Sequence, residues 1–176
     1  MKSDNKMNSP SNKIKTRKEI IKICEELRKK GKKIVSTNGS FDIFHYGHVL
    51  FLEEAKKQGD VLIAGVNTDD SIRRWKKHIG YKDWAKRPIN NAEARAGTLA
   101  ALECVDYVTL FDETDCLKFV ESVKPNVHAN GSEYGKNCIE APTVRKYGGK
   151  VHIVKIVEGY STSKLIKKIT DAYKDD

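Results

Sequence analysis

The sequence lacks long apolar runs and has few cysteines. No apolar segment approaches the ~20 residues that a membrane helix needs, and residues 1–13 lack the apolar stretch of a secretory signal. Only four cysteines occur, and no two of them form a C-x-x-C pair: Cys24, Cys104, Cys116 and Cys138. These absences argue against a zinc site and a membrane span. We therefore expect a cytoplasmic protein with free thiols and no membrane contact.

Positive charge is in excess, but it is not spread along the chain. The formal net charge is +9. Residues 1–33 carry 12 Lys and Arg against 4 Asp and Glu, which leaves 21 against 20 for the rest. A nucleic-acid groove requires positive charge across the folded part, so the sequence disfavours such a partner, while a basic tail that contacts nucleic acid or anionic lipid stays open. We expect residues 1–13 to be a disordered basic tail and residues 14–176 to form one domain.

Helical and strand patterns alternate after the tail. Thr16 and Glu19 form a capping box, and Gly31 is placed to end the first helix. Helical spacing recurs at about 46–58, 69–75, 91–103, 114–122 and 161–173. Short β-rich runs lie at about 34–37, 61–66, 107–110, 127–129 and 151–156. The alternation predicts an α/β fold, with a doubly wound, five-stranded, Rossmann-like parallel sheet and helices on both faces. Residues 75–91 have no clear period and suggest a long loop with the character of a mobile lid.

Open parallel sheets bind ligands beyond the carboxyl ends of their strands. There, directly after the first strand and its loop, His45-Tyr46-Gly47-His48 begins a helix. Residues three apart face the same way, so the two imidazoles converge. The helix start adds unpaired N–H groups and a positive dipole, and Gly47 admits a ligand to the backbone. These parts suit a triphosphate, whose transfer needs positioning and charge stabilisation. A metal site on the two histidines is the alternative, with Asp42 as the arguable third ligand.

The loop Asn38-Gly39-Ser40-Phe41-Asp42, followed by His45-Tyr46-Gly47-His48, resembles the signature of the nucleotidyltransferases named for their HIGH motif. That superfamily includes cytidylyltransferases, pantetheine-phosphate adenylyltransferase and the class I aminoacyl-tRNA synthetases, for which this chain is too short. Similarity extends from about Glu19 to Ile169. It is strongest to the adenylyltransferase domain of bacterial ADP-heptose synthase, in GDVLIAGVNTDDSIRRWK, RPINNAEARAGTLAALECVDYV and EGYSTSKLIKKI.

The resemblance implies transfer of a nucleotidyl group from an NTP, ATP in the heptose enzymes, to heptose 1-phosphate, with release of pyrophosphate. It further implies Mg²⁺ with the NTP, no resident metal, and a homo-oligomer. The alternatives are a CTP-dependent cytidylyltransferase acting on a polyol or alcohol phosphate, and a regulatory module that binds nucleotide without catalysis. Intact His45 and His48 speak against the regulatory module, because binding alone tolerates their loss.

The resemblance also assigns roles to matching residues. Catalytic roles fall on His45, His48 and Lys76. Nucleotide binding falls on Asn38, Gly39, Ser40, Phe41, Asp42, Gly47, Asp69, Arg95, Asn130, Gly131, Glu133, Ser161 and Thr162. Simpler interpretations stay open for three of these positions. Ser161 is a good helix cap in any protein, Arg95 suits a helix-surface ion pair, and Lys76 suits a solvated side chain.

Three positions depart from the patterns of related enzymes. Asn130 stands where the heptose enzymes carry a lysine, and residues 76–87 form a longer loop than theirs. Ile156 stands where glycerol-phosphate cytidylyltransferases carry an arginine, which argues against that group. The first two departures lie where specificity for the base or the acceptor is set. The sequence therefore does not decide whether the nucleotide is ATP or CTP, nor which phosphorylated molecule is the acceptor.

Overall fold

A single parallel sheet lies at the centre of the computed structural model, which describes residues 9–155 and 159–174. Its strands are β1 (Ile34–Gly39), β2 (Val61–Asn67), β3 (Tyr107–Phe111), β4 (Val127–Gly131) and β5 (Lys150–Val154). They run in the order β3-β2-β1-β4-β5, and every pairing is parallel. The order reverses between β1 and β4, and at that switch point such sheets leave a crevice at their carboxyl ends. The predicted five-stranded Rossmann-like fold is confirmed.

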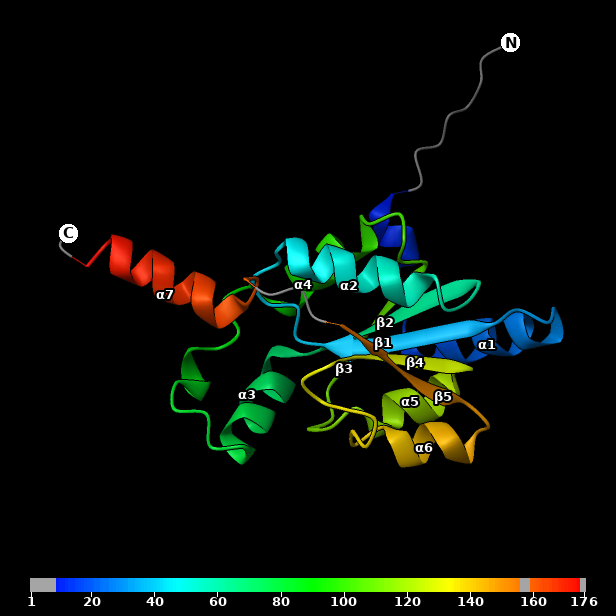
Figure 1. Cartoon of the computed structure of the whole chain (residues 1–176). Helices are drawn as coiled ribbons and strands as arrows, with labels where there is room; N and C mark the ends of the chain where they lie inside the picture. Colours follow the sequence, from blue (N-terminus) through cyan, green and yellow to red (C-terminus); the bar gives the residue numbers. More distant parts are fainter. Residues whose placement is uncertain (1–8, 156–158, 175–176) are drawn as a thin grey trace, which may run out of the picture.

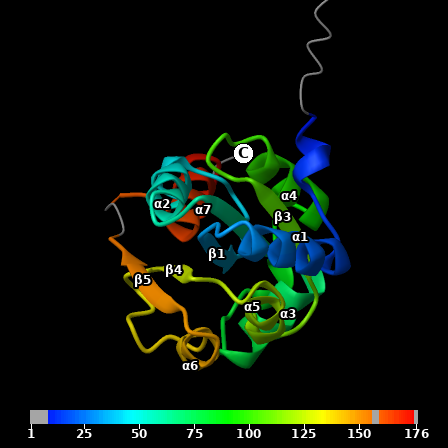
Figure 2. The same ribbon diagram turned by 90° about the vertical axis from the view of Figure 1, so that its right-hand side faces the viewer.

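Helices cover both faces of the sheet, as predicted (Figures 1 and 2). The covering helices are α1 (Arg17–Lys29), α2 (Tyr46–Lys56), α3 (Asp69–His78), α4 (Ala92–Ala100), α5 (Leu117–Val123) and α6 (Ala141–Lys146), whereas α7 (Thr162–Ala172) extends away from the sheet. Leu52 of α2 and Leu99 of α4 pack in one core cluster, whereas Ile20 of α1 and Phe119 of α5 pack in a second. The two clusters form because β2 is an apolar run buried on both of its faces.

Local signals correctly predicted most helices, but several boundaries and one helix differ from expectation, and the helix expected over 69–75 continues to His78. The capping box is present, with the Thr16 N–H donating to Glu19 Oε2 at 2.8 Å. The helix expected over 91–103 ends at Ala100, and the one expected from residue 114 begins at Leu117. The sequence did not predict α6. With six residues it is too short for a helical period to be recognised, and only Ala141 and Val144 of it are buried.

The N-terminal segment differs from the expected disordered tail in its second part. Residues 1–8 lie outside the described chain. Pro10–Lys13 forms the 3-10 turn η1, and Lys13 Nζ donates to Leu102 O and Val105 O at 2.8 Å each. The Lys15 N–H then donates to Val108 O at 2.8 Å. These contacts are to main-chain carbonyls of a distant segment, so no periodicity in the sequence announces them.

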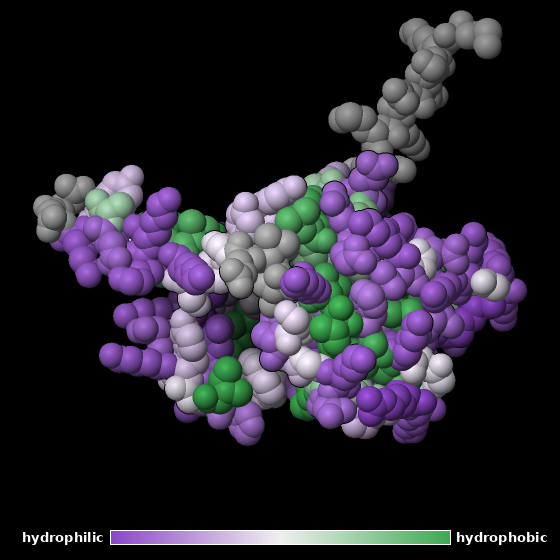
Figure 3. All heavy atoms as spheres, in the orientation of Figure 1, coloured by the Kyte–Doolittle hydropathy of each residue, from purple (hydrophilic) through white to green (hydrophobic). Residues whose placement is uncertain are grey.

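The surface agrees with the composition. Figure 3 shows mostly hydrophilic residues on one face, with apolar residues in small groups. Among the described residues, no helix combines the length and apolarity needed to cross a bilayer. The helix α7 projects from the body in Figure 1, and none of its described residues is buried.

Candidate active site

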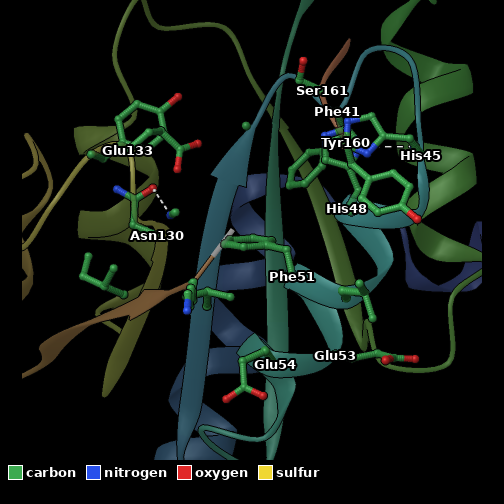
Figure 4. Close-up of a pocket in the computed structure, with 18 of the residues that line it drawn as sticks. Phe41, His45, His48, Phe51, Glu53, Glu54, Asn130, Glu133, Tyr160 and Ser161 are labelled. Atoms are coloured by element: carbon green, nitrogen blue, oxygen red, sulfur yellow. Dashed lines mark hydrogen bonds between the residues drawn. The ribbon is translucent and has the colours of Figure 1, made fainter. Parts of the chain in front are cut away.

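A cavity of about 790 Å³ opens where β1 and β4 end. Its wall is built by the loop after β1, helix α2, the ends of β4 and β5, and the start of α7 (Figure 4). The structure brings most of the predicted site residues into this wall: Asn38, Gly39, Ser40, Phe41, His45, Gly47, His48, Asn130, Gly131, Glu133, Ser161 and Thr162. Because these residues come from segments far apart in the sequence, only the fold unites them.

The two histidines form a stacked pair at the start of α2. Their ring centroids are 3.8 Å apart and the planes are inclined by 15°. The backbone N–H of His45 donates to His48 Nδ1 at 3.3 Å. The neutral His48 ring therefore accepts at Nδ1 and carries its proton on Nε2. Phe44 stacks on His48 at 5.3 Å, and Phe41 meets it edge-on at 5.5 Å. Backbone and aromatic contacts thus hold the His48 ring in one orientation.

Burial sets the charge state of this pair. Burial, together with the neighbouring His45, lowers the pKa of His48 to about 4. Burial also lowers the pKa of His45. Both rings are therefore neutral at pH 7 and present hydrogen-bonding N–H groups. An anionic triphosphate at the start of α2 favours their protonated forms, because an opposite charge raises the pKa of a nearby imidazole.

We expect the buried histidines to make folding stability fall in mild acid. Besides His48, the fully buried His128 of β4 has its pKa lowered to about 4 by burial. An unfolded chain protonates histidine near pH 6.5, so the unfolded state binds more protons and stability is lost as pH falls from about 6.5 to 4. Urea denaturation at pH 7 and 5 tests this. The free energy of unfolding should fall by about 1–2 kcal/mol per histidine. His128→Asn should show a smaller fall than the unchanged protein, and equal falls would contradict the assignment.

The start of α7 lies beside the histidine pair, at the same cavity. Ser161 Oγ accepts from the Lys164 N–H at 3.2 Å, so Ser161 is the N-cap of α7. The Tyr160 ring lies 6.3 Å from that of His45. A Cβ added at Gly47 would come within 2.7 Å of Tyr160 Cβ and 3.1 Å of His45 Nδ1. Gly47 therefore permits this close packing, and two helix N-termini meet at one cavity as a result. Gly47 also lines the cavity, and its role in admitting a ligand to the backbone stays a prediction.

Asp42 does not line the cavity, although the sequence placed it in the nucleotide site. It is 2% exposed. Its carboxylate accepts from Arg87 Nε at 2.6 Å, from the Ile89 N–H at 2.8 Å and from the Asn90 N–H at 2.9 Å. Asp42 therefore anchors the end of the 75–91 loop to the loop after β1. The end of the loop around residues 87–90 is therefore fixed to the protein, which contradicts the prediction of a mobile lid there. Within the loop, residues Trp84–Lys86 form the 3-10 turn η2.

Arg95 and Asp69 also lie outside the cavity lining. Arg95 is 1% exposed. Its guanidinium donates to Ser40 O at 2.6 Å, Asn67 O at 2.7 Å, Asn90 O at 2.9 Å and Asp69 Oδ1 at 2.7 Å. This buried clamp is not the helix-surface ion pair that the sequence left open, and the nucleotide contact of Arg95 stays a prediction. The clamp joins the loop after β1 to the end of β2 and to the 75–91 loop.

The clamp supports an unusual backbone at Phe41, whose φ is +46°. Bulky residues rarely adopt this region, and such strain persists only where the surroundings enforce it. Arg95 holds the preceding carbonyl of Ser40, and Asn90 Nδ2 donates to Asp42 O at 2.7 Å. The turn directs the chain from β1 into α2 and thereby sets the position of the histidine pair. Asp42 and Arg95 thus affect the site indirectly, because they fix the loop that leads into α2.

Lys76 lies near Asp42 and Arg87, outside the cavity lining. Its Nζ is 4.2 Å from the centroid of the Tyr81 ring. Burial lowers its pKa, Arg87 lowers it further, and Asp42 opposes both. The structure therefore places Lys76 next to the loop after β1 but separates it from the histidine pair.

Sequence reasoning missed a buried polar cluster below the cavity. At its centre is Glu140, which is 5% exposed and accepts from Cys116 Sγ at 3.0 Å. Burial opposes its charged form, but His128 and the thiol hydrogen bonds outweigh this and lower its pKa. Nearby, Ser36 Oγ lies 2.8 Å from His128 Nδ1. Residues 132–146 have no periodicity that could mark Glu140. Further cavity residues that the sequence did not mark lie on and just after α2: Leu50, Phe51, Glu53, Glu54 and Lys57.

Fold and site together are those of a nucleotidyltransferase, with a cavity of about 790 Å³ at a switch point and two helix starts around a histidine pair. Residues 36–171 match the cytidylyltransferase-like family, and the chain belongs to it. It is 43% identical over 165 residues to the bifunctional protein HldE of Geobacter metallireducens, and 44% identical over 167 residues to that of Aliarcobacter butzleri. These matches cover 93% and 94% of this chain but 32% and 33% of the relatives, so the chain spans about a third of their length.

Two solved structures are similar in fold. The lipopolysaccharide core biosynthesis protein of Thermoplasma volcanium is 33% identical with a TM-score of 0.54, over 74% of this chain and all of that one. The pantoate-β-alanine ligase of Francisella tularensis, solved with βγ ATP and β-alanine, has a TM-score of 0.58 over 93% of this chain and 79% of that one. At 16% identity the ligase supports the fold alone.

Proposed function

We propose that this chain transfers the adenylyl group of ATP to a sugar 1-phosphate, heptose 1-phosphate, and releases pyrophosphate. The observation that carries the proposal is the stacked His45 and His48 pair at the start of α2, beside the start of α7 at one cavity. The similarity to HldE proteins over more than nine-tenths of the chain supports the choice of substrates. Both substrates are cytoplasmic metabolites, so we also place the reaction there.

In this mechanism an oxygen of the acceptor phosphate attacks the α-phosphorus of ATP. The new P–O bond forms as the bond to the bridging oxygen breaks, and that electron pair leaves with pyrophosphate. His48 Nε2–H and His45 stabilise the charge that grows on the phosphoryl oxygens, and the N–H groups at the starts of α2 and α7 add to it. The acceptor phosphate is already anionic near neutral pH, so no protein base has to remove a proton. Lys76 is proposed to bind a phosphate group as the substrates assemble.

Mg²⁺ belongs to the substrate in this proposal. Among residues 9–155 and 159–174, no three His, Cys, Asp or Glu side chains are grouped so as to hold a metal ion. The ion would arrive bound to the triphosphate oxygens, which are the hard ligands that Mg²⁺ prefers. We further propose a homo-oligomer. Its support is the resemblance to the family and the exposed apolar side chains of the C-terminal segment, with Ile169 49% and Tyr173 70% exposed.

Pyrophosphate release tests the assignment. We expect the highest kcat/KM with ATP and D-glycero-β-D-manno-heptose 1-phosphate, measured across four NTPs and a panel of sugar, glycerol and alcohol phosphates. Release that depends on both substrates shows transfer, whereas release without an acceptor shows only hydrolysis. A highest value with CTP and a polyol or alcohol phosphate would replace the proposal with the cytidylyltransferase alternative. Nucleotide binding without turnover on any acceptor would favour the regulatory module.

A further inference from the structure

Glu140 links the ends of two adjacent strands at the base of the cavity. Its Oε1 accepts from Asn38 Nδ2 of β1 at 3.5 Å, and its Oε2 accepts from Asn130 Nδ2 of β4 at 3.3 Å. Cys116 Sγ also donates to Oε1 at 3.0 Å, and the Cys138 side chain contacts the same carboxylate. One buried carboxylate thus takes the amide groups of two cavity residues.

This arrangement decides how both amides are turned. An ionised carboxylate can only accept hydrogen bonds, so each asparagine must direct its NH₂ towards Glu140 and its oxygen away. Asn130 Oδ1 then accepts from the Gly131 N–H at 3.1 Å. Within the described chain, Asn38 Oδ1 is buried and accepts no hydrogen bond. A buried acceptor without a donor is unfavourable, so its partner is expected to arrive with the ligand.

The chemistry of Asn38 Oδ1 excludes a triphosphate as that partner. Phosphate oxygens of a nucleotide are acceptors near neutral pH, and two acceptors facing each other repel. The partner has to carry an O–H or N–H group. Asn38 lines a cavity whose wall continues past Phe51 of α2 and Ile153 of β5, apolar surfaces that suit a nucleoside.

We infer that Asn38 Oδ1 accepts a hydrogen bond from a hydroxyl or amino group of the nucleoside, and that Glu140 positions it without touching substrate. This rests on the proposed use of an NTP. The inference gives the Asn38 side chain a role in binding the nucleoside, whereas the resemblance placed it against the triphosphate. Glu140 then acts on nucleoside recognition through the amide orientation it imposes.

Binding of ATP and of inorganic tripolyphosphate to the full chain separates the two roles. Glu140→Gln offers one acceptor and one NH₂ group, so it cannot take both asparagine amides as Glu140 does. Calorimetric titration should show a Kd for ATP raised about 5–10-fold, the size of one lost hydrogen bond, and an unchanged Kd for tripolyphosphate. An equal loss for both ligands, or no loss for ATP, would overturn the inference.

A double variant tests whether a weaker affinity of Glu140→Gln comes from lost orientation of Asn38 or only from partial unfolding. In Glu140→Gln with Asn130→Asp, the new carboxylate accepts from the glutamine NH₂, and the glutamine oxygen again accepts from Asn38. Affinity for ATP should rise above that of Glu140→Gln, because the orientation of Asn38 is restored, although recovery is only partial since Asn130 itself lines the cavity. A folded double variant that stays as weak as Glu140→Gln would count against positioning.

Analogues identify the donor. We compare 2′-deoxy-ATP, 3′-deoxy-ATP and inosine triphosphate, which lack the 2′-hydroxyl, the 3′-hydroxyl and the adenine amino group. The analogue without the relevant donor should bind the unchanged protein and Glu140→Gln equally. If the difference persists with all three analogues, the inference is wrong. Failure of the unchanged protein to bind both ATP and tripolyphosphate would instead refute the proposed function.

Discussion

Replacing His48 with alanine is expected to lower kcat for nucleotidyl transfer by about 10²–10³, with little change in the Kd of the NTP. The imidazole is neutral in the free protein because burial lowers its pKa to about 4. Its Nε2–H is directed by the hydrogen bond that Nδ1 accepts from the His45 backbone. A donor placed in this way stabilises the transition state more than the ground state, since the phosphoryl oxygens gain charge as the bond to pyrophosphate breaks.

His45→Ala should show a loss of similar size, and the double variant should lose less than the product of the two. The rings stack at 3.8 Å and act on the same developing charge, so their contributions are not independent. His45 Nδ1 is also buried and, in the described chain, unpaired. We expect His45 Nδ1, once protonated, to donate a hydrogen bond to a phosphate oxygen of the bound NTP.

Steady-state and single-turnover kinetics measure kcat, while equilibrium titration measures the Kd of the NTP. His78→Ala is the matched control, because His78 is an exposed histidine at the end of α3 and packs only beside Trp75 among the rings of the described chain. Its kcat should stay within about twofold of the unchanged protein. Unchanged kcat in both His45→Ala and His48→Ala would remove the proposed catalytic pair.

The histidine pair was predictable from sequence because its signals are local. A strand, a glycine-containing loop and a helix start follow one another within residues 34–48, and spacing by three places both rings on one side of the helix. Ser161 was likewise marked by its position before an apolar helical repeat. The fold followed from the same kind of signal, since fully buried strands such as β2 are continuous apolar runs.

The rest of the site depends on tertiary contacts that leave no local pattern. Asp42 and Arg95 have the charge of ligand-binding residues, but apart from the contact of Arg95 with Asn90 O their partners lie more than 25 positions away along the chain. Glu140 stands in a segment without periodicity, and its partners Asn38 and Cys116 come from other elements. Sequence indicates which polar residues are present near the strand ends. Only the packing decides which of them face the cavity and which bind the protein itself.

Arg95→Ala is expected to lower the free energy of unfolding by about 3–5 kcal/mol, the range for removing one partner from a buried ion pair. The side chain is fully buried and joins three main-chain carbonyls to the carboxylate of Asp69. Its loss leaves Ser40 O, Asn67 O and Asn90 O without this donor. The strained turn at Phe41 then loses one of its restraints, so the loop that leads into α2 becomes less well fixed.

Arg73→Ala is the matched control. Arg73 lies on the neighbouring helix α3 and pairs with Asp70 at 2.8 Å, but both side chains are exposed and the pair is local. Exposed pairs of this kind contribute about 0.2–1 kcal/mol. Arg95→Lys should restore less than half of the loss, because one ammonium group cannot reach acceptors that a planar guanidinium contacts from several nitrogens.

Urea denaturation at pH 7 gives the stability of each variant, and titration with NTP under fully folded conditions gives the Kd. We expect the stability of Arg95→Ala to fall steeply, while the Kd of the folded fraction rises only modestly, because Arg95 reaches the cavity through the loop after β1. The opposite pattern, intact stability with a large rise in Kd, would show that the guanidinium binds nucleotide directly, as the sequence suggested. The comparison therefore separates a residue that contacts the ligand from one that holds the loop in place around it.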